Sequence, residues 1–425
     1  MSQSNISGVR GWCPGALKPM ESGDGLIVRL RARAGMLAAD ELLAIAGIAQ
    51  RYGNGLIDLT RRANLQIRGV KPEGLTDLLS DLSMLGLLDN GARAESVRNV
   101  MVSPLSGIDP TEVCDLRAIA RELEHRLCND PALWELPGKF GFIVDGGGLL
   151  PLDDERADIR IKGIRVGDET RVALAIDGPK GTAWLGVAHL SAAVDAAICI
   201  AHVFLKARGP DVRSRMRDVP QPARSRLQAA AAADLSPANL QPRPHQQPPP
   251  LGVLDHEGTV IAAGIAAPFG RIEAEALRAL ASTAIDLGIT GFRPSPWRSF
   301  YADVSDKQAA YTLSSAAEAQ SFIVDAADPL LAIDACPGAP SCGSTSLDTR
   351  AVARRLAPLL RELGCRCAHV SGCAKGCARS KSADLVLVGD GDRFGVMRND
   401  TAQAKPLAFV LPARLSQLPT ILAAK

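Results

Sequence analysis

Apolar side chains recur in two periods along this chain: every second residue in short stretches, and every third or fourth residue in longer ones. Residues 29–70 contain an alternating stretch, a glycine turn, a helical stretch, a glycine and a second alternating stretch. Residues 265–304 repeat this order of patterns. The patterns predict strand, helix and strand in each segment, and therefore a duplicated α+β unit.

The duplication extends beyond these two segments. Residues 115–123 (DLRAIAREL) match residues 348–356 (DTRAVARRL), each with apolar residues at helical spacing after an aspartate that can cap the first turn. At the same offset, Ser103 falls on Cys336. We expect two related halves packed about a pseudo-twofold axis, with ligands bound where the halves meet.

A segment rich in proline, alanine and glutamine separates the halves. Residues 208–250 include an alanine run and the sequence SPANLQPRPHQQPPP, which cannot bury a core and is typical of a linker. The predicted domains are two smaller repeats at 17–90 and 251–320, and two larger α/β domains at 95–207 and 322–425.

Composition limits the class of protein. The chain has 425 residues, of which 47% are hydrophobic, enough for two or three cores. No apolar run approaches the roughly 18 residues that span a bilayer, and the N-terminus lacks the pattern of a secretory signal, so we expect a cytoplasmic protein that does not bind membranes. The net charge of +2 argues against a dedicated nucleic-acid binder.

Four of the ten cysteines have the spacing of a metal site. Cys336 and Cys342 are separated by five residues, and Cys373 and Cys377 by three, in two loops rich in glycine and proline. In a reducing compartment, four thiolates indicate zinc or an iron–sulfur cluster. Structural zinc sites favour tighter two-residue spacing. The pattern therefore favours a 4Fe–4S cluster, with zinc and unliganded cysteines as alternatives.

The remaining cysteines carry weaker signals. Cys13 begins a second CPGA sequence but has no neighbouring cysteine, so a buried thiol is the preferred interpretation. Cys365, Cys367 and His369 alternate, which would place them on one face of a strand, either as small core residues or as a second metal site. Core positions are also expected for the three cysteines in helical patterns, Cys114, Cys128 and Cys199.

The cysteine spacing resembles that of the sulfite and nitrite reductase superfamily, whose members hold a 4Fe–4S cluster against a siroheme. Residues 59–69 (LTRRANLQIRG) are similar to the Thr-Arg-x-x-x-Gln-x-x-Gly type of strand in that superfamily. The resemblance implies a sulfite reductase-like α+β fold, in which duplicated ferredoxin-like repeats accompany two larger α/β domains.

Other stretches resemble the precorrin-3B synthase family, which acts in aerobic cobalamin biosynthesis. They are CPGALKPMESGDGLIVRLR, LPGKFGFIVDGGG, PWRSFY, ACPGAPSCGS and HVSGCAKGCAR. The chain departs from the reductases where they usually carry Leu-Pro-Arg-Lys-Phe, because glycine stands at position 138. It also lacks a convincing counterpart of their lysine pair. A small oxyanion needs several converging cations, so these losses argue against sulfite or nitrite reduction.

The resemblance implies a monooxygenase that converts precorrin-3A to precorrin-3B with dioxygen, by hydroxylation of a meso carbon and lactone formation. Arg62 falls opposite Arg298 when a one-residue shift between the repeats is allowed. Guanidinium and ammonium groups would bind the substrate carboxylates by charge-assisted hydrogen bonds. The expected substrate-binding residues are Arg62, Asn64, Gln66, Arg68, Lys139, Arg298 and Lys375, and the catalytic residue stays open.

The resemblance also implies a second iron site and an electron donor. The family is thought to use a nonheme iron, whose ligands the sequence does not reveal. The glycine-rich stretches at 145–148 and 389–392 lack the spacing of a dinucleotide loop, so we expect an external NADH-dependent reductase or a ferredoxin-type electron donor. The alternatives are a siroheme-dependent sulfite or nitrite reductase, and a non-enzymatic tetrapyrrole carrier or electron-transfer protein.

Overall fold

A computed structural model describes residues 14–237 and 250–423; Cys13 lies outside the described residues. Two five-stranded sheets form the centre of the molecule, in the orders β1-β2-β5-β4-β13 and β11-β12-β15-β14-β3. Their strands are β1 (Met20–Ser22), β2 (Gly25–Arg31), β3 (Leu37–Ala38), β4 (Leu56–Leu59), β5 (Asn64–Val70), β11 (Gly252–His256), β12 (Thr259–Ala266), β13 (Arg271–Glu273), β14 (Gly291–Pro294) and β15 (Ser299–Asp303).

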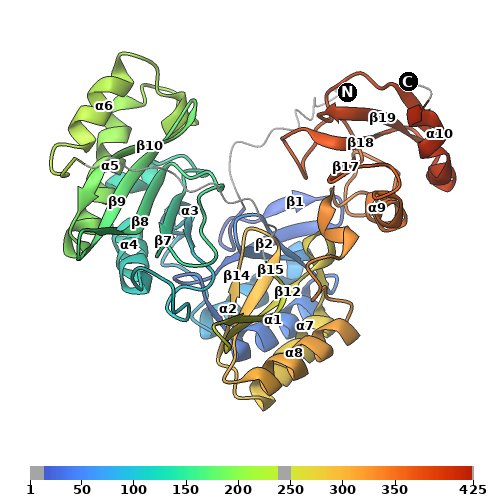
Figure 1. Ribbon diagram of the computed structural model, residues 1–425, viewed down its shortest axis with the longest axis horizontal. Coiled ribbons are helices and arrows are strands. Elements are labelled where there is room, and N and C mark those ends of the chain that lie inside the picture. The colour runs from blue at the N-terminus through green and yellow to red at the C-terminus, as the bar shows by residue number, and fades with distance from the viewer. Residues whose placement is uncertain (1–13, 238–249, 424–425) are drawn as a thin grey trace.

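Helices cover one face of these two sheets and close a shared core (Figure 1). They are α1 (Ala39–Tyr52), α2 (Leu75–Met84), α7 (Ala274–Asp286) and α8 (Lys307–Ala319). Ile45 of α1, Leu65 of β5, Leu277 of α7 and Phe300 of β15 are fully buried in a single cluster. Each contributes about 1.5–3 kcal/mol by leaving water. Because both repeats supply this cluster, they fold as one unit.

The two repeats also exchange a short strand. Strand β3 belongs to the first repeat but pairs with β14 of the second, placing Leu37 opposite Phe292. Conversely, β13 of the second repeat pairs with β4 of the first, placing Ile272 opposite Ile57. Each repeat therefore completes the other's sheet, and the segments predicted at 17–90 and 251–320 are interlocked.

The two larger domains lie on opposite sides of this core (Figure 1). Each contains a five-stranded sheet in which the first three strands are parallel and the last two antiparallel. The N-terminal sheet contains β6 (Val100–Val102), β7 (Phe142–Asp145), β8 (Ile159–Val166), β9 (Glu169–Gly178) and β10 (Gly181–Ala188). The C-terminal sheet contains β16 (Ile333–Ala335), β17 (Ala368–Ser371), β18 (Ala383–Asp390), β19 (Arg393–Asp400) and β20 (Ala408–Val410).

A backbone hydrogen bond at the first crossover confirms the duplication. The amide of Ser103 donates to the carbonyl of Val144 at 3.0 Å, and the amide of Cys336 donates to the carbonyl of Val370 at 3.1 Å. The helices are α3 (Ala92–Val97), α4 (Arg117–Asn129), α5 (Ala193–Ala207) and α6 (Ala223–Ala231) in the N-terminal domain, and α9 (Thr349–Leu356) and α10 (Leu418–Ala423) in the C-terminal domain.

One helical stretch is more apolar than the sequence analysis allowed. Leu190–Ala207 passes the length and composition test for a membrane-spanning helix, with a mean hydropathy of 1.6 over 18 residues. Its side chains at Ala197, Ile200 and Phe204 are fully buried in the core of the N-terminal domain, where they pack with the sheet. This segment is therefore a core helix of that domain.

The start of the segment predicted as a linker is folded. Residues 208–237 include α6, and Ser236 exchanges backbone hydrogen bonds with Val187 at the edge of the sheet. Arg215 forms an ion pair with the fully buried Asp158. A carboxylate buried at this depth without a cationic partner would strongly destabilise the fold. The prediction of a linker over 208–250 is thus wrong for 208–237; residues 238–249 lie outside the described residues.

Candidate functional site

Strand alternation gives the first central sheet one apolar and one polar face. Val28, Leu65 and Ile57 point into the core, whereas their neighbours on β2, β5, β4 and β13 point away from it. The polar neighbours form a row across the sheet, in the order Arg29, Gln66, Asp58 and Arg271. With its oxygen facing Arg29, the Gln66 amide accepts hydrogen bonds from that side chain at 2.7 and 3.1 Å.

Asp58 is surrounded by three arginines. Its carboxylate oxygens lie 2.7 Å from Arg271 Nε, 3.3 Å from Arg68 Nη1 and 3.5 Å from Arg350 Nη1. Burial by itself would raise the pKa of Asp58, but these guanidinium groups outweigh it and hold the pKa below its ordinary value. Burial, with nearby arginines, lowers the pKa of Arg350 to about 10.

Arg68 supports a loop rather than a ligand. Its guanidinium is buried, donates to Asp24 at 2.7 and 2.9 Å and to Ser22 at 2.9 Å, and lies 3.5 Å from the carbonyl oxygen of Ser341. The Ser22 hydroxyl also donates to this carbonyl at 3.1 Å. These contacts fix the loop that carries Cys342. They differ from the expectation that Arg68 binds a substrate carboxylate, because its donors already have partners.

The four cysteines at the predicted spacing lie in loops of the C-terminal domain. Cys336 directly follows β16, and Cys373 and Cys377 follow β17. The amide of Gly372 donates to Cys336 Sγ at 3.1 Å. Burial raises the pKa of Cys377, and the nearby thiols of Cys373, Cys336 and Cys342 raise it further. The structure therefore brings the four side chains into one neighbourhood.

Backbone conformation lets these loops wrap closely. Gly376 has a φ of +60°, and a Cβ at this position would lie 3.0 Å from Ala402 Cβ. Gly338 has a φ of +64°, and its Cβ would lie 2.5 Å from Thr349 Oγ1. Side chains are disfavoured at both positions by strain and by space. The two glycines therefore keep the cysteine loops close to the sheet and to α9.

Four thiols in one neighbourhood can hold a metal ion or a cluster, since soft sulfur donors suit both. Within residues 14–237 and 250–423, no group of three or more His, Cys, Asp or Glu side chains is arranged to hold one metal ion. A four-iron cluster separates its thiolate ligands more widely than a single zinc ion does. The nonheme iron implied by the resemblance has no ligand set among these same residues.

Cys365 and Cys367 do not share a face, contrary to the prediction. Cys365 is buried with Leu363 and Leu385 in the domain core. Cys367 packs on the other side of the sheet, with Val386, and its sulfur lies 3.8 Å from Arg379 Nη2. The chain reaches β17 only at Ala368, so the strand alternation assumed from the sequence does not extend back to these cysteines.

A second carboxylate, Asp334 of β16, also collects three arginines. It forms ion pairs with Arg61, with Arg298 Nη1 at 3.4 Å and with Arg379 Nη1 at 3.0 Å. Arg61 and Arg298 come from turns of the two central sheets, so Asp334 joins both repeats to the C-terminal domain. Burial by itself would raise the pKa of Asp334, but the arginines leave it below its ordinary value.

His369 lies opposite Asp334 on the adjacent strand β17. The side chain is fully buried, and neither ring nitrogen has a hydrogen-bond partner in the described part of the chain. Burial lowers the pKa of this imidazole, as do the positive charges of Arg379, Arg61 and Arg298, although Asp334 opposes them. A neutral ring at this position adds no charge to the arginines around Asp334.

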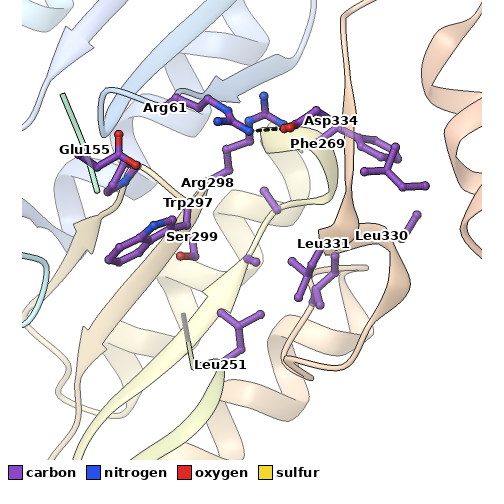
Figure 2. A pocket seen from close by; sticks show the side chains of 15 residues that line it. Arg61, Glu155, Leu251, Phe269, Trp297, Arg298, Ser299, Leu330, Leu331 and Asp334 are labelled. Carbon is purple, nitrogen blue, oxygen red and sulfur yellow. Dashed lines mark hydrogen bonds and ion pairs between the residues drawn. The ribbon is translucent and has the colours of Figure 1, made fainter. Parts of the chain in front are cut away.

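Two adjoining cavities connect these groups. One, of about 180 Å³, is lined by Glu155, Trp297 and Asp334 among others, and Figure 2 shows Arg61 and Arg298 directed toward Asp334. The other, of about 220 Å³, is lined by Cys336, Cys377 and Arg350 among others. Both cavities include Arg61, Arg298 and Phe269. We call the two together the arginine cleft; it runs from the thiols to Glu155.

The turns that carry the arginines correspond between the repeats. The amide of Thr60 donates to Asn64, and the amide of Ser295 donates to Ser299, both at 2.9 Å. In each turn the residue before the second strand has a positive φ, 53° at Ala63 and 62° at Arg298. Arg298 therefore corresponds to Ala63. The predicted equivalence of Arg62 and Arg298 is wrong by one position, and Arg62 corresponds to Trp297.

The other predicted binding residues lie around the cleft rather than in its walls. Arg62 is exposed, and its Nη1 lies against Gly141 of the N-terminal domain. Lys139 is exposed two residues before this glycine, and Asn64 is buried on β5. Lys375 is exposed, with Nζ 3.5 Å from Ser344 Oγ. Of the seven predicted residues, Gln66 and Arg298 line a cavity.

Sequence reasoning missed Arg61, Asp334 and Glu155, although Arg61 is adjacent to a predicted residue. The lining of the cleft holds equal numbers of both charges, in the residues Arg61, Arg298, Arg350, Asp58, Asp334 and Glu155, and further arginines lie behind it. The two carboxylate centres and Asp24 contain three carboxylates and six arginines, an excess of three positive charges, in the set Asp24, Asp58, Asp334, Arg61, Arg68, Arg271, Arg298, Arg350 and Arg379. This excess of arginine behind the lining favours an anionic ligand in the cleft.

Some known proteins match a segment of this chain, and others match nearly all of it. The model of the nitrite/sulfite reductase ferredoxin-like half domain matches residues 18–85. A precorrin-3B synthase from a Sinorhizobium species is 33% identical over 403 residues, which cover 94% of this chain and 85% of that protein. A ferredoxin–nitrite reductase from Leptolyngbya laminosa is 31% identical over 140 residues, or 32% of this chain and 27% of that protein.

The fold matches a solved structure over the full chain. The NirA protein of Mycobacterium tuberculosis superposes with a TM-score of 0.76 and 19% sequence identity, covering 100% of this chain and 83% of the other. This match confirms the predicted fold, with ferredoxin-like repeats between two α/β domains.

Proposed function

Since the chain belongs to the precorrin-3B synthase family, within the sulfite and nitrite reductase superfamily, we propose that it is an oxygen-dependent monooxygenase of cobalamin biosynthesis. The substrate would be precorrin-3A and the product precorrin-3B, formed by hydroxylation of a meso carbon and closure of a lactone. Cobalamin biosynthesis is supported by the relative over 94% of the chain. The oxygen chemistry is the proposed step.

The excess of arginine around the cleft is the observation that carries this proposal. Precorrin-3A is a reduced tetrapyrrole with carboxylates on side chains around its rim, so it can approach several cations at once. Arg61 is about half exposed and Arg298 is mostly buried, with side-chain exposures of 54% and 16%, so both can present donors to a ligand while Asp334 orients them. Charge-assisted, bidentate contacts of this kind fix both position and orientation.

Cys336, Cys342, Cys373 and Cys377 would hold a 4Fe–4S cluster, which supplies single electrons to the reaction when it is bound. The chain's own residues provide the surroundings. Cys336 and Cys377 line the arginine cleft, so the cluster site borders the substrate site. Phe269 and Trp297 give the cleft apolar surfaces that suit a flat macrocycle and exclude water from it.

Electrons would come from a separate protein. The stretch at 145–148 is closed on itself, because the Asp145 carboxylate accepts hydrogen bonds from the amides of Gly147 and Leu152, both at 2.9 Å. Residues 389–392 form the turn between β18 and β19. Neither has the helix that follows a dinucleotide loop. We propose an NADH-dependent reductase or a ferredoxin-type protein as donor, in the cytoplasm, with no membrane or nucleic acid involved.

A siroheme-dependent sulfite or nitrite reductase is the second candidate function. The observation in its favour is the ferredoxin–nitrite reductase match over 140 residues. Against it, Gly138 stands where the reductases carry an arginine, so the cations expected around a small oxyanion are fewer.

The test is turnover of precorrin-3A under ¹⁸O₂ with a chemical or enzymatic reductant, followed by mass spectrometry. The proposal predicts a product that contains one labelled oxygen atom, and labelled water. Reduction of sulfite or nitrite without oxygen incorporation into the tetrapyrrole would overturn it in favour of the reductase. A chain that binds the tetrapyrrole but catalyses neither reaction would indicate a carrier.

A further inference from the structure

Glu155 enters the arginine cleft from the N-terminal domain. It lies between β7 and β8, and Figure 2 shows its carboxyl group on the side of the cavity opposite Asp334, near Trp297. The residue is half-buried. Its carboxylate has no hydrogen bond or ion pair with any residue in 14–237 or 250–423, which distinguishes it from Asp58 and Asp334.

The backbone around Glu155 is held firmly. Its amide donates to the carbonyl of Leu152 at 3.0 Å. The buried guanidinium of Arg160 donates to the carbonyl of Leu152 at 2.9 Å and to that of Glu155 at 2.6 Å. Arg160 therefore closes this turn with both of its terminal nitrogens. The backbone that carries the Glu155 side chain is therefore fixed, whereas the carboxyl oxygens have no partner among the described residues.

The charges near Glu155 are mainly positive. Arg61 and Arg62 face it from the turn between β4 and β5, and Lys381 from the segment before β18, while Asp154 is its neighbour in the chain. The three cations lower the pKa of Glu155 and Asp154 raises it, but burial has the largest effect and leaves the pKa above its ordinary value. A carboxyl group of this kind can hold a proton closer to neutral pH.

The other ionisable groups of the same cavity cannot serve as proton donors. Arg61 and Arg298 stay charged at any pH of interest. Asp334 is ionised and engaged by three arginines. Among the residues that line this cavity, Glu155 is therefore the one carboxyl group that is both unpaired and raised in pKa, as a proton donor requires.

We propose that Glu155 is the proton donor of the arginine cleft. The inference rests on the proposed monooxygenase function, which requires dioxygen, two electrons from the external donor and two protons. The O–O bond breaks; one oxygen atom forms the new C–O bond and the other leaves as water. The Glu155 carboxyl group gives one of the two protons to the oxygen atom that leaves as water, and the carboxylate is reprotonated from solvent. General acids typically contribute about 10²–10⁴-fold to a rate.

The test compares Glu155→Gln and Glu155→Asp with wild type, and uses Asp154→Asn, an exposed neighbour, as the matched control. Each full-length protein is purified with its iron, and turnover of precorrin-3A is measured as a function of pH. We expect Glu155→Gln to lower turnover about 10²-fold or more. Wild-type turnover should fall as pH rises through the pKa of the group, and the residual rate of Glu155→Gln should lack this fall. Glu155→Asp should retain part of the rate. Asp154→Asn should retain the full rate at low pH, with the fall moved to slightly lower pH because Asp154 no longer raises the pKa of Glu155.

Two further measurements separate a proton donor from a structural residue. Glu155→Gln should bind the tetrapyrrole with an affinity within about twofold of wild type, and its visible spectrum should match that of the wild-type iron–sulfur protein. If wild type turns over precorrin-3A and Glu155→Gln has the same rate and the same pH profile, this inference is overturned and the proposed function is not. Loss of tetrapyrrole affinity in step with turnover would also overturn it, and would assign Glu155 to binding. Absence of ¹⁸O incorporation by wild type would overturn the proposed function and this inference together.

Discussion

The two α/β domains share one backbone frame but complete it in different ways. In the N-terminal domain, the loops after β6 and β7 are closed by carboxylates of these two loops and of the end of β7. Asp109 accepts from the amides of Thr111 at 2.8 Å and Leu149 at 2.5 Å, and Glu112 accepts from that of Gly107 at 2.7 Å. Asp145 does the same for the glycine-rich turn after β7. These loops need no ligand to satisfy their amides.

The corresponding loops of the C-terminal domain carry thiols instead. Cys336 occupies the place of Ser103, and Gly372 donates its amide to sulfur rather than to a carboxylate. The comparison shows how one duplicated frame produces an asymmetric molecule. The N-terminal domain forms a self-contained wall that contributes Glu155 to the cleft, and the C-terminal domain carries the four thiols for which we propose a 4Fe–4S cluster.

The largest expected effect comes from removing a thiol in the C-terminal domain. Cys373→Ser should lose the broad visible absorption of the cluster and all turnover, because a cluster short of one thiolate is poorly held. Iron content and dithionite-dependent absorbance measure the effect. Cys199→Ser is the control and should match wild type, because Cys199 is exposed on α5; its predicted core position is wrong. Turnover without a cluster would remove the electron-relay role.

The next effect concerns the cleft between the two domains. Arg61→Ala should weaken tetrapyrrole binding about 10- to 100-fold, since a charge-assisted hydrogen bond contributes about 1.5–3 kcal/mol. The cluster spectrum should stay intact. Absorbance titration with the tetrapyrrole gives the affinity, and Arg366→Ala, at a side chain that is 94% exposed, is the control. Equal affinities for the two variants would make Arg61 purely structural, as a partner of Asp334.

A smaller effect is expected from opening the self-contained loops. Asp145 is fully buried, and Asp145→Ala leaves the amides of Gly147 and Leu152 without partners. Each buried unpaired amide costs about 1–3 kcal/mol, so the urea midpoint should fall while iron content is retained. Asp390→Ala removes an exposed ion pair with Arg393 and should stay within about 0.5 kcal/mol of wild type. Similar midpoints for both variants would show that Asp145 does not hold the loop.

The smallest effect is expected from copying one thiol into the N-terminal domain. Ser103→Cys recreates the residue found at Cys336 but leaves the carboxylates of the loops in place. The iron content per chain should remain that of wild type, because one added thiol cannot hold a second 4Fe–4S cluster. Ser103→Ala is the control for the lost hydroxyl. Additional iron in Ser103→Cys would mean that thiols alone decide which half binds metal.

Local pattern and spacing predicted much of this molecule. The alternation in residues 29–70 and 265–304 gave the central sheets, and the match between residues 115–123 and 348–356 gave the duplication. The cysteine spacing identified the loops that the structure brings together. Each of these signals lies within a short stretch of chain, where the side-chain period or the ligand interval is visible directly.

The sequence pattern could not predict which distant segments of the chain contact one another. The exchange of β3 and β13 depends on pairing between residues more than two hundred positions apart. Arg68 was misjudged because its partner Asp24 lies on a neighbouring turn of the fold, 44 residues earlier in the chain. Arg61, rather than Arg62, reaches the cleft because the turn after β4 directs successive side chains to different sides. The folding of residues 208–237 depends on the buried partner Asp158.

We propose that this fold holds a tetrapyrrole as substrate, beside a cluster in the C-terminal domain. The visible spectrum of anaerobically purified protein, before and after dithionite, separates a bound substrate from a bound cofactor. We expect a broad absorption that bleaches on reduction, without the sharp red band of a bound siroheme. A resolved siroheme band would instead make this protein a reductase with the tetrapyrrole as its cofactor.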